Sequence, residues 1–566
     1  MVRSLLTACL CAAALAAPVA AQQERTLMPG VTYERSVEYT LHGPVVVHVV
    51  EGPRPTGLYA LRPVLGRSTV LGKERLTAME KRLAPSATTV GVNGDVFTGG
   101  FPNGLVVQAG FFRTSPLGTR SSLGVDAAGT LTVARLPFVG DWRGTGQRRA
   151  LNDLNQPAPA GGTSLFTPTW GGPTPVAADA VELVLAPFPE PRPNQDVKGR
   201  VTRVLRGGNH AIPPGAAILF GRGNAGTRLS TEAPVGTDVT VRAILPGPFA
   251  GAIDGIGGGP ILVRNKKPVF RANEAFQPSW LIPRMARTAV GQRADGRILL
   301  VTADGGRPGY SSGMTNFELA QELVRLGAVT GMALDAGASS AVAFEGDLLN
   351  RPTGAERQIA DALLLMYFGV HAPPPSDDVV SPNGDGVAEH AIVSYKLVRP
   401  STVVAELLGP GSARVPVDSG SKQPGSYKFT WTGLDGNGRV LPEGHWSWHV
   451  AAKDDLARTS EADRPLSLNV TLKALTLEPA VVQRGGSVRI GVDLLRPAKA
   501  TIRIETRGGA VLRTLVNRQA NTGHVAVAWD GRVGSRRVAA GTYVVRASAT
   551  NAVGTVDLIR SVQAAR

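Results

Sequence analysis

The last third of the chain repeats itself at a spacing of about 97 residues. The segment 397–400 (Leu-Val-Arg-Pro) recurs at 494–497 (Leu-Leu-Arg-Pro), and Trp431 recurs as Trp529. Similarity at a fixed spacing predicts two copies of one structural unit. Each copy contains short alternating segments followed by Asp/Gly turns, a pattern typical of β-sandwiches. We therefore expect the chain to end in two all-β sandwiches.

A proline-rich segment, 371–375, separates these repeats from a larger region that mixes strands with one clear helix. There, Thr315 and Glu318 form a capping box before an amphipathic run. Apolar segments at 298–301 and 329–334 flank this helix, so we expect a βαβ unit whose two strands are parallel. The sequence predicts an α+β domain with a mixed sheet containing that unit.

These features define four parts of the chain. We predict a signal peptide at 1–21, an α+β domain at 22–371, and sandwiches at 372–475 and 476–566. Within the first domain we expect a β-rich insertion at about 140–248. Its strands are expected at 181–185, 201–205, 217–220 and 239–245, after a loop at 140–180.

The N-terminus has the features of an export signal. Arg3 precedes an apolar run, and the small residues at 19–21 fit cleavage after Ala21. A second interpretation is a lipoprotein-type box ending at Cys9. Because Cys9 and Cys11 are the two cysteines of the chain, cleavage after Ala21 leaves no thiol and no disulfide. We expect a secreted, periplasmic or cell-surface protein without a transmembrane anchor.

Composition excludes several functions. Lys and Arg number 60 against 44 Asp and Glu, a net charge of +16, but the basic residues are scattered and aromatics make up 5%. A nucleic-acid binder usually shows a basic stripe or stacking aromatics, so we expect no nucleic acid. No histidine falls between 211 and 370, so this block cannot supply a Ser-His-Asp relay or a histidine metal site. We expect no metal and no cofactor.

Several apolar runs end in a polar residue close to glycine. Asn93, Asp254, Asp304 and Asp335 all occupy such positions. Ligands bind beyond the carboxyl ends of strands in open α/β sheets, so Asp304 and Asp335 are expected to converge. Convergent carboxylates suit cleavage of glycosidic bonds, which makes Asp335, Asp304 and Asp254 the catalytic candidates. The alternative for each is an ordinary turn aspartate.

Other residues near these positions suit an anion. Hydroxyl and backbone N–H groups after Asp335 can cradle one, and arginines match phosphate oxygens in two-point fashion. A surface arginine with no binding role is the alternative. The candidates for binding substrate or phosphate are Asn93, Arg287, Thr288, Gly337, Ser339, Ser340 and Arg357.

A series of spaced motifs resembles one enzyme family. They are Asn93-Gly-Asp, Gly257-Gly-Gly-Pro-Ile-Leu, Arg287-Thr-Ala-Val-Gly, Ala303-Asp-Gly, Gly313-Met-Thr-Asn-Phe-Glu-Leu-Ala, Leu334-Asp-Ala-Gly-Ala-Ser-Ser, Asn350-Arg-Pro and Glu356-Arg. In this order, over about 90–370, they resemble the phosphodiester glycosidase family. The resemblance implies hydrolysis of a sugar-1-phosphodiester and places Asn93, Arg287, Asp304, Asp335, Ser339 and Arg357 in the site.

On this basis Arg287, with Arg357, is expected to hold the phosphodiester. Asp335 or Asp304 then acts at the anomeric carbon, as nucleophile or as base for water. The family usually has Asp-Gly-Gly-Gly-Ser where this chain has alanine at 336 and 338. If either glycine takes a positive φ, alanine would strain the loop.

The two repeats resemble the Ig-like domain of flagellar hook-capping type, which assigns no chemistry. We therefore expect an exported hydrolase that takes a glycan or sugar-phosphate substrate in envelope or extracellular glycopolymers. Contact of the Ig-like pair with a cell surface or glycopolymer is also expected. Two alternatives stay open: another glycan hydrolase on the same scaffold, or a non-enzymatic glycan-binding or adhesive surface protein.

Overall fold

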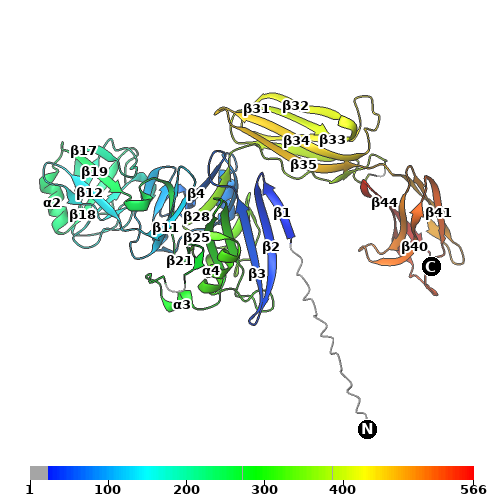
Figure 1. The fold of residues 1–566 in the computed structure, drawn as a ribbon, viewed down its shortest axis with the longest axis horizontal. Coiled ribbons are helices and arrows are strands. Elements are labelled where there is room, and N and C mark those ends of the chain that lie inside the picture. The colour runs from blue at the N-terminus through cyan, green and yellow to red at the C-terminus, as the bar shows by residue number, and fades with distance from the viewer. Residues whose placement is uncertain (1–22, 270–271, 385, 566) are drawn as a thin grey trace, which may run out of the picture. The chain divides into compact units, whose positions relative to one another are not determined.

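The computed structural model describes residues 23–269, 272–384 and 386–565 (Figure 1). The chain divides into two compact units, which meet at the Tyr367–Phe368 bond. The predicted signal peptide lies outside the described residues. Among the residues described, no helix is long and apolar enough to cross a membrane.

The first unit is organised around an eight-stranded sheet in which every neighbouring pair is antiparallel. In spatial order its strands are β1 (Gln23–Met28), β2 (Val31–Thr40), β3 (Gly43–Gly52), β24 (Ile298–Ala303), β23 (Arg287–Arg293), β25 (Ala328–Ala333), β21 (Ile261–Arg264) and β22 (Lys267–Pro268). The helix α4 (Asn316–Arg325) packs on one face of this sheet through Leu319 and Leu323.

The other face of that sheet packs against two five-stranded antiparallel sheets. One is ordered β27 (Asp347–Leu348), β26 (Val342–Phe344), β5 (Thr88–Asn93), β28 (Asp361–Tyr367) and β4 (Tyr59–Leu65). The second is ordered β11 (Leu131–Arg135), β10 (Ser121–Asp126), β20 (Ala252–Gly257), β8 (Val106–Gln108) and β9 (Phe111–Thr114). Val290, Val92 and Ile256, one from each sheet, belong to the same buried cluster. These three sheets therefore form a layered β structure with α4 on the outer face of the eight-stranded sheet.

The sheet was expected to be mixed, but all its neighbouring strands are antiparallel. β24 and β25 run in the same direction and are joined by α4, but β23 lies between them and is antiparallel to both. The reason is that 287–293 forms a buried strand in its own right. Small residues at its centre fit under α4, since a Cβ on Gly291 would lie 3.2 Å from Leu323.

The insertion forms its own eight-stranded sheet around a separate buried cluster. The four strands expected there are present, but the predicted loop at 140–180 also contributes strands. In order they are β13 (Arg149–Ala150), β12 (Val139–Arg143), β19 (Asp238–Ile244), β17 (Asp196–Arg206), β16 (Ala180–Leu185), β18 (Ala217–Arg222), β15 (Thr163–Phe166) and β14 (Asp153–Leu154). The remaining α-helices of this unit are α1 (Leu76–Leu83), α2 (Asn224–Glu232) and α3 (Pro278–Leu281).

The second unit contains two β-sandwiches with corresponding strand orders. The first pairs a sheet of β29 (Val379–Val380), β35 (Thr459–Leu468), β34 (Gly444–Asp454), β31 (Ser401–Leu408) and β32 (Arg414–Lys422) with β30 (Ala391–Leu397) and β33 (Gly425–Trp431). The second pairs β37 (Val481–Val482), β45 (Gly554–Ala564), β44 (Gly541–Asn551), β39 (Ala498–Glu505) and β40 (Val511–Ala520) with β36 (Leu472–Glu478), β38 (Val488–Leu494) and β41 (Gly523–Trp529). Trp431 and Trp529 are both buried, each at the end of the equivalent strand.

Candidate functional site

The loops that follow β5 and β25 are joined by hydrogen bonds at one edge of the first unit. The Asn93 side-chain nitrogen donates to the Asp335 carbonyl at 2.8 Å, and the Asp335 N–H donates to the Gly94 carbonyl at 2.9 Å. The Asn93 side-chain oxygen accepts from the Thr288 hydroxyl at 2.7 Å and from the Ala341 N–H at 3.1 Å. Asn93 and Thr288 are fully buried, so both hold the loops in place and neither presents a free polar group.

Three buried carboxyl groups gather at this edge: Asp95 after β5, Asp335 after β25 and Asp361 at the start of β28. Their exposed fractions are 3%, 3% and 0%. The Asp95 N–H donates to Asp361 Oδ1 at 2.8 Å. Burial raises the pKa of Asp95 to about 7, and that of Asp335 above its ordinary value. Burial and the neighbouring Asp95 charge raise the pKa of Asp361 well above its ordinary value. Carboxyl groups with raised pKa values are candidates for proton transfer.

Glycines leave the space that this carboxyl cluster occupies. A Cβ on Gly94 would lie 2.3 Å from Asp361 Oδ1, and one on Gly257 would lie 2.4 Å from Asp95 Oδ2. A Cβ on Gly104 would approach the same Asp95 oxygen to 2.9 Å. Because close-packed interiors do not tolerate such overlaps, each glycine is required by the carboxyl group beside it.

Two arginines face the carboxyl cluster. Arg357 donates to the Ser339 hydroxyl at 3.1 Å, and its guanidinium lies 4.7 Å from the centre of the Phe97 ring. Arg120 shares a narrow cleft with Asp95, and both guanidinium charges act to lower the pKa of Asp335 against the larger effect of burial. The Arg120 Nη1 atom is buried and has no hydrogen-bond partner among the described residues. Within the described part of the chain, the Arg120 guanidinium thus retains an unused hydrogen-bond donor close to the carboxyl cluster.

The loop after Asp335 accommodates its two alanines. Ala336 has an extended backbone with φ −127° and ψ 178°, and Ala338 is not among the residues with positive φ. The positive φ of this loop, +66°, falls on Gly337, where the sequence keeps glycine. The alanines therefore cause no backbone strain. Ser339 hydrogen-bonds the Asp335 carboxylate, and the buried Ser340 donates its N–H to the Gly337 carbonyl at 3.1 Å.

Asp304 belongs to a neighbouring network and does not join the carboxyl cluster. It is fully buried and accepts hydrogen bonds from His48 at 3.0 Å, Tyr310 at 2.9 Å and Asn350 at 2.9 Å. Burial acts to raise the pKa of Asp304, but these hydrogen bonds outweigh it and hold the pKa below its usual value. Asp304 follows β24 and Asp335 follows β25. Because β23 lies between these two strands, the two carboxyl groups do not stand at adjacent strand ends, as the prediction of convergence assumed.

Asp254 and Arg287, two of the predicted site residues, have structural partners outside the carboxyl cluster. The Asp254 carboxylate pairs with Arg62 of β4 at 3.0 Å and accepts from the Ala109 N–H at 2.8 Å, so its ion pair links the two five-stranded sheets. Arg287 is 2% exposed and donates to three backbone carbonyls, at 2.7, 2.8 and 3.1 Å. Because each of its three nitrogens donates one of these bonds, Arg287 braces the segment around α3; its expected role as a phosphate clamp stays a prediction.

Sequence reasoning missed four residues. Asp95 had a detectable signal, because it directly follows the Asn93-Gly94 pair, whereas Asp361 begins a strand and carries no glycine signal. Arg120 stands alone in a loop before β10. His48 was visible as the one polar residue in the apolar run 45–50, but its pairing with Asp304 depends on the neighbouring strands β3 and β24. Among the described residues, no group of three His, Cys, Asp or Glu is placed to hold a metal ion.

Buried carboxyl groups lie beside arginines on an antiparallel β scaffold, an arrangement whose chemistry suits both proton exchange and anion binding. Residues 196–366 match the model of a family described as phosphodiester glycosidase, and residues 479–552 match that of the FlgD Ig-like domain. The glycosidase match contains Asp335, Arg357 and Asp361, whereas Asp95 and Arg120 precede it.

Individual relatives match smaller parts of the chain. An SPbeta prophage-derived uncharacterized protein of Bacillus subtilis (strain 168), YomE, is 34% identical over 134 residues, 23% of this chain and 19% of that protein. The structure of a hypothetical protein from Synechocystis is 25% identical with a TM-score of 0.52, and the match covers 62% of this chain and 64% of that one. The zebrafish N-acetylglucosamine-1-phosphodiester alpha-N-acetylglucosaminidase catalytic domain is 12% identical with a TM-score of 0.33, covering 61% and 87%. The chain thus spans about a fifth of the prophage protein and under two thirds of the Synechocystis chain.

Proposed function

We propose that the first unit hydrolyses the glycosidic bond of a sugar-1-phosphodiester. The observation that carries this proposal is the buried cluster of Asp95, Asp335 and Asp361 beside Arg120 and Arg357. The match of 196–366 to the phosphodiester glycosidase family supports the same reaction class.

The proposed roles follow from the charges. Arg120 and Arg357 bind the phosphate, because guanidinium groups pair well with phosphate oxygens. A phosphate ester is already a weak base, so its departure needs charge stabilisation more than a strong general acid. Asp335, which is held by Ser339 and the Ala336 N–H, acts at the anomeric carbon as nucleophile or as base for water.

Asp95 and Asp361 manage the protons of the site. With a pKa of about 7, Asp95 is close to the point where a carboxyl group can both accept and donate a proton at neutral pH. Asp361 stays protonated beside it, since two adjacent buried carboxylates do not both ionise. We place Asp304 and Arg287 outside these steps, as residues that position the surrounding loops.

The wider setting is part of the same proposal. A leader at 1–21 directs the chain to the periplasm, the cell surface or the medium, where the substrate is an envelope or extracellular glycopolymer. The Ig-like pair contacts that polymer or the cell surface. Cleavage of another glycan linkage, or binding of a glycan without cleavage, remain the competing functions.

Release of free sugar by the purified full chain tests the reaction. We expect release from a sugar-1-phosphodiester such as UDP-N-acetylglucosamine, and its loss in Asp335→Asn by at least 100-fold, the scale of lost acid–base or nucleophilic help. The matched control is Asp254→Asn, which removes a buried carboxylate outside the cluster and should keep activity. Equal loss in both variants, or retention in Asp335→Asn, would overturn the assignment. Absence of sugar release with retained glycan binding would favour a binding protein.

A further inference from the structure

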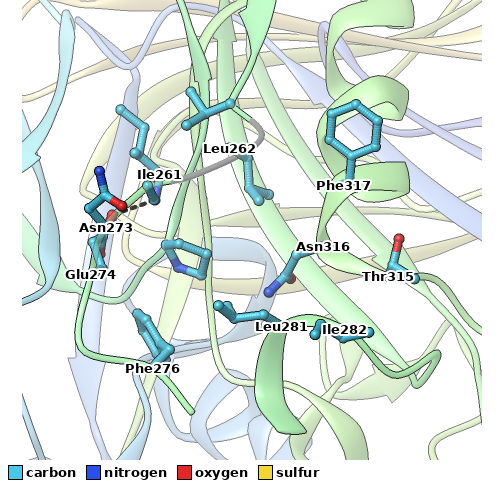
Figure 2. Close-up of a pocket in the computed structure, with 13 residues that line it drawn as sticks. Ile261, Leu262, Asn273, Glu274, Phe276, Leu281, Ile282, Thr315, Asn316 and Phe317 are labelled. Carbon is cyan, nitrogen blue, oxygen red and sulfur yellow. Dashed lines mark hydrogen bonds between the residues drawn. The ribbon is translucent and has the colours of Figure 1, made fainter. Parts of the chain in front are cut away.

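An open pocket of about 580 Å³ lies between residues 260–269 and 272–282 on one side and the start of α4 on the other (Figure 2). Its walls are mostly apolar, from Ile261, Leu262, Phe276, Leu281, Ile282 and Phe317. Figure 2 shows Phe276 and Phe317 on opposite sides of it, with Asn316 between them. A pocket of this size with apolar walls and few polar groups is typical of small-ligand sites.

One polar side chain in this pocket lacks a partner. Asn316 is 8% exposed, and its side-chain oxygen is buried without a hydrogen-bond donor among the described residues. Leaving a buried acceptor unpaired is costly, so this oxygen is suited to a ligand that donates a hydrogen bond. The nearby Glu274 is already engaged, because its carboxylate accepts from the Ser121 N–H and hydroxyl and from the Ile261 N–H.

The pocket adjoins the carboxyl cluster through Arg120. The Arg120 guanidinium lies 4.4 Å from the centre of the Phe276 ring, and its Nε donates to the Ala275 carbonyl at 3.3 Å. Phe276 therefore lines the pocket and also supports the arginine beside Asp95. Phe276 is thus the residue that the pocket and Arg120 share.

We infer that the pocket binds the leaving group of the substrate, on the far side of its phosphate, and that this group is a flat ring bearing a hydrogen-bond donor. The inference rests on the proposed function for the placing of the phosphate. Apolar and aromatic walls suit the faces of a ring, and the Asn316 oxygen accepts from an N–H or O–H on its edge. A simple alkyl chain would fill the walls but leave this oxygen unpaired. A nucleobase and a phenolic ring share the required chemistry.

Binding of three phosphates to the full chain, measured by calorimetry, tests this inference without turnover. The probes are uridine 5′-monophosphate, 4-hydroxyphenyl phosphate and n-hexyl phosphate. We expect at least one ring phosphate to bind more tightly than the hexyl phosphate, and the tighter of the two identifies the ring. Asn316→Leu should weaken that ring phosphate about tenfold, the effect of one lost hydrogen bond, and leave the hexyl phosphate unchanged or tighter.

Gln321→Leu is the matched control, because Gln321 lies on the exposed side of the same helix; it should leave all three affinities unchanged. Should Asn316→Leu fail to fold, Asn316→Ser, which keeps a shorter polar group, should weaken the ring phosphate by a smaller factor. Tightest binding of the hexyl phosphate, or ring binding that is unaffected by both Asn316 substitutions, would overturn the inference.

The binding and sugar-release measurements together distinguish a failure of the proposed function from a failure of this inference. If ring binding depends on Asn316 but no diester releases sugar, the proposed function fails and the pocket stands as a binding site. If sugar is released equally well from ring and hexyl diesters, the function stands and the leaving-group inference fails.

Discussion

Neutralising Asp95 should change how the stability of the first unit depends on pH. The pKa of this carboxyl group is raised by burial from 3.8 to about 7 in the folded protein. Between these values the folded state binds a proton that the unfolded state has lost. The stabilising contribution of that proton is fully present below pH 4 and is lost as the pH rises through 7.

The size of this effect follows from the two pKa values. At 1.36 kcal/mol for each pH unit, the difference between 3.8 and about 7 corresponds to about 4 kcal/mol. Asp95→Asn removes this contribution, and it also removes a charge that raises the pKa of Asp361, which acts in the same direction. Going from pH 4 to pH 8, wild type should therefore lose about 4 kcal/mol of stability relative to the variant.

Hydrogen exchange in the full chain measures this change locally. Peptides from β5 and β28 report unfolding of the first unit, after correction for the intrinsic effect of pH on exchange. In wild type the Val96 N–H donates to Asp95 Oδ1, and replacing that carboxylate by an amide changes stability by an amount that does not depend on pH. Comparing how stability changes with pH in wild type and in the variant cancels this constant amount. Asp347→Asn, at an exposed position, serves as the control and should match wild type. A wild-type-minus-variant difference that stays constant from pH 4 to pH 8, or grows, would refute the reasoning.

Three further substitutions test the packing around the site. Gly257→Ala should destabilise the first unit by about 1–3 kcal/mol because its Cβ would lie 2.4 Å from Asp95 Oδ2. Its control is Gly251→Ala, which has open space around the new Cβ. Equal unfolding midpoints for the two variants would contradict the prediction. Arg287→Met should lower stability by about 3 kcal/mol by leaving backbone carbonyls unpaired; unchanged urea unfolding with lost sugar release would instead restore its role as phosphate clamp. Thr315→Ala should cost about 1 kcal/mol through loss of the capping box, and a thermal scan without a lower midpoint would disprove that.

Local sequence signals predicted the elements of the fold well. The capping box at Thr315 and Glu318 is confirmed, with both reciprocal hydrogen bonds present. The two sandwiches could be predicted because a repeated pattern identifies the same fold twice. The pairing of β23 with β24 is local, because the two strands form a hairpin across residues 294–297. The pairing of β23 with β25 joins segments that are distant in sequence, and it is this contact, which places β23 between β24 and β25, that the local pattern did not predict.

The resemblance to the phosphodiester glycosidase family pointed to Arg357, and glycine at a strand end pointed to other residues of the proposed site. That signal found Asp335 and the loop around Gly337, but it also selected Asp254, which pairs with Arg62 away from the cluster. Asp361 and Arg120 carry no such mark, and they reach Asp335 only because β28 and the loop before β10 pack at the same edge. Buried carboxyl groups from separate segments have to be found through the folded structure.

The position of the broken bond tests the central claim most directly. Hydrolysis of a sugar-1-phosphodiester by the full chain in ¹⁸O-labelled water separates the two outcomes by mass spectrometry of the products. A glycosidase breaks the bond between the anomeric carbon and oxygen, so the label should enter the released sugar and leave the phosphate unlabelled. Label in the phosphate would show attack at phosphorus, and it would contradict the proposed action of Asp335 at the anomeric carbon.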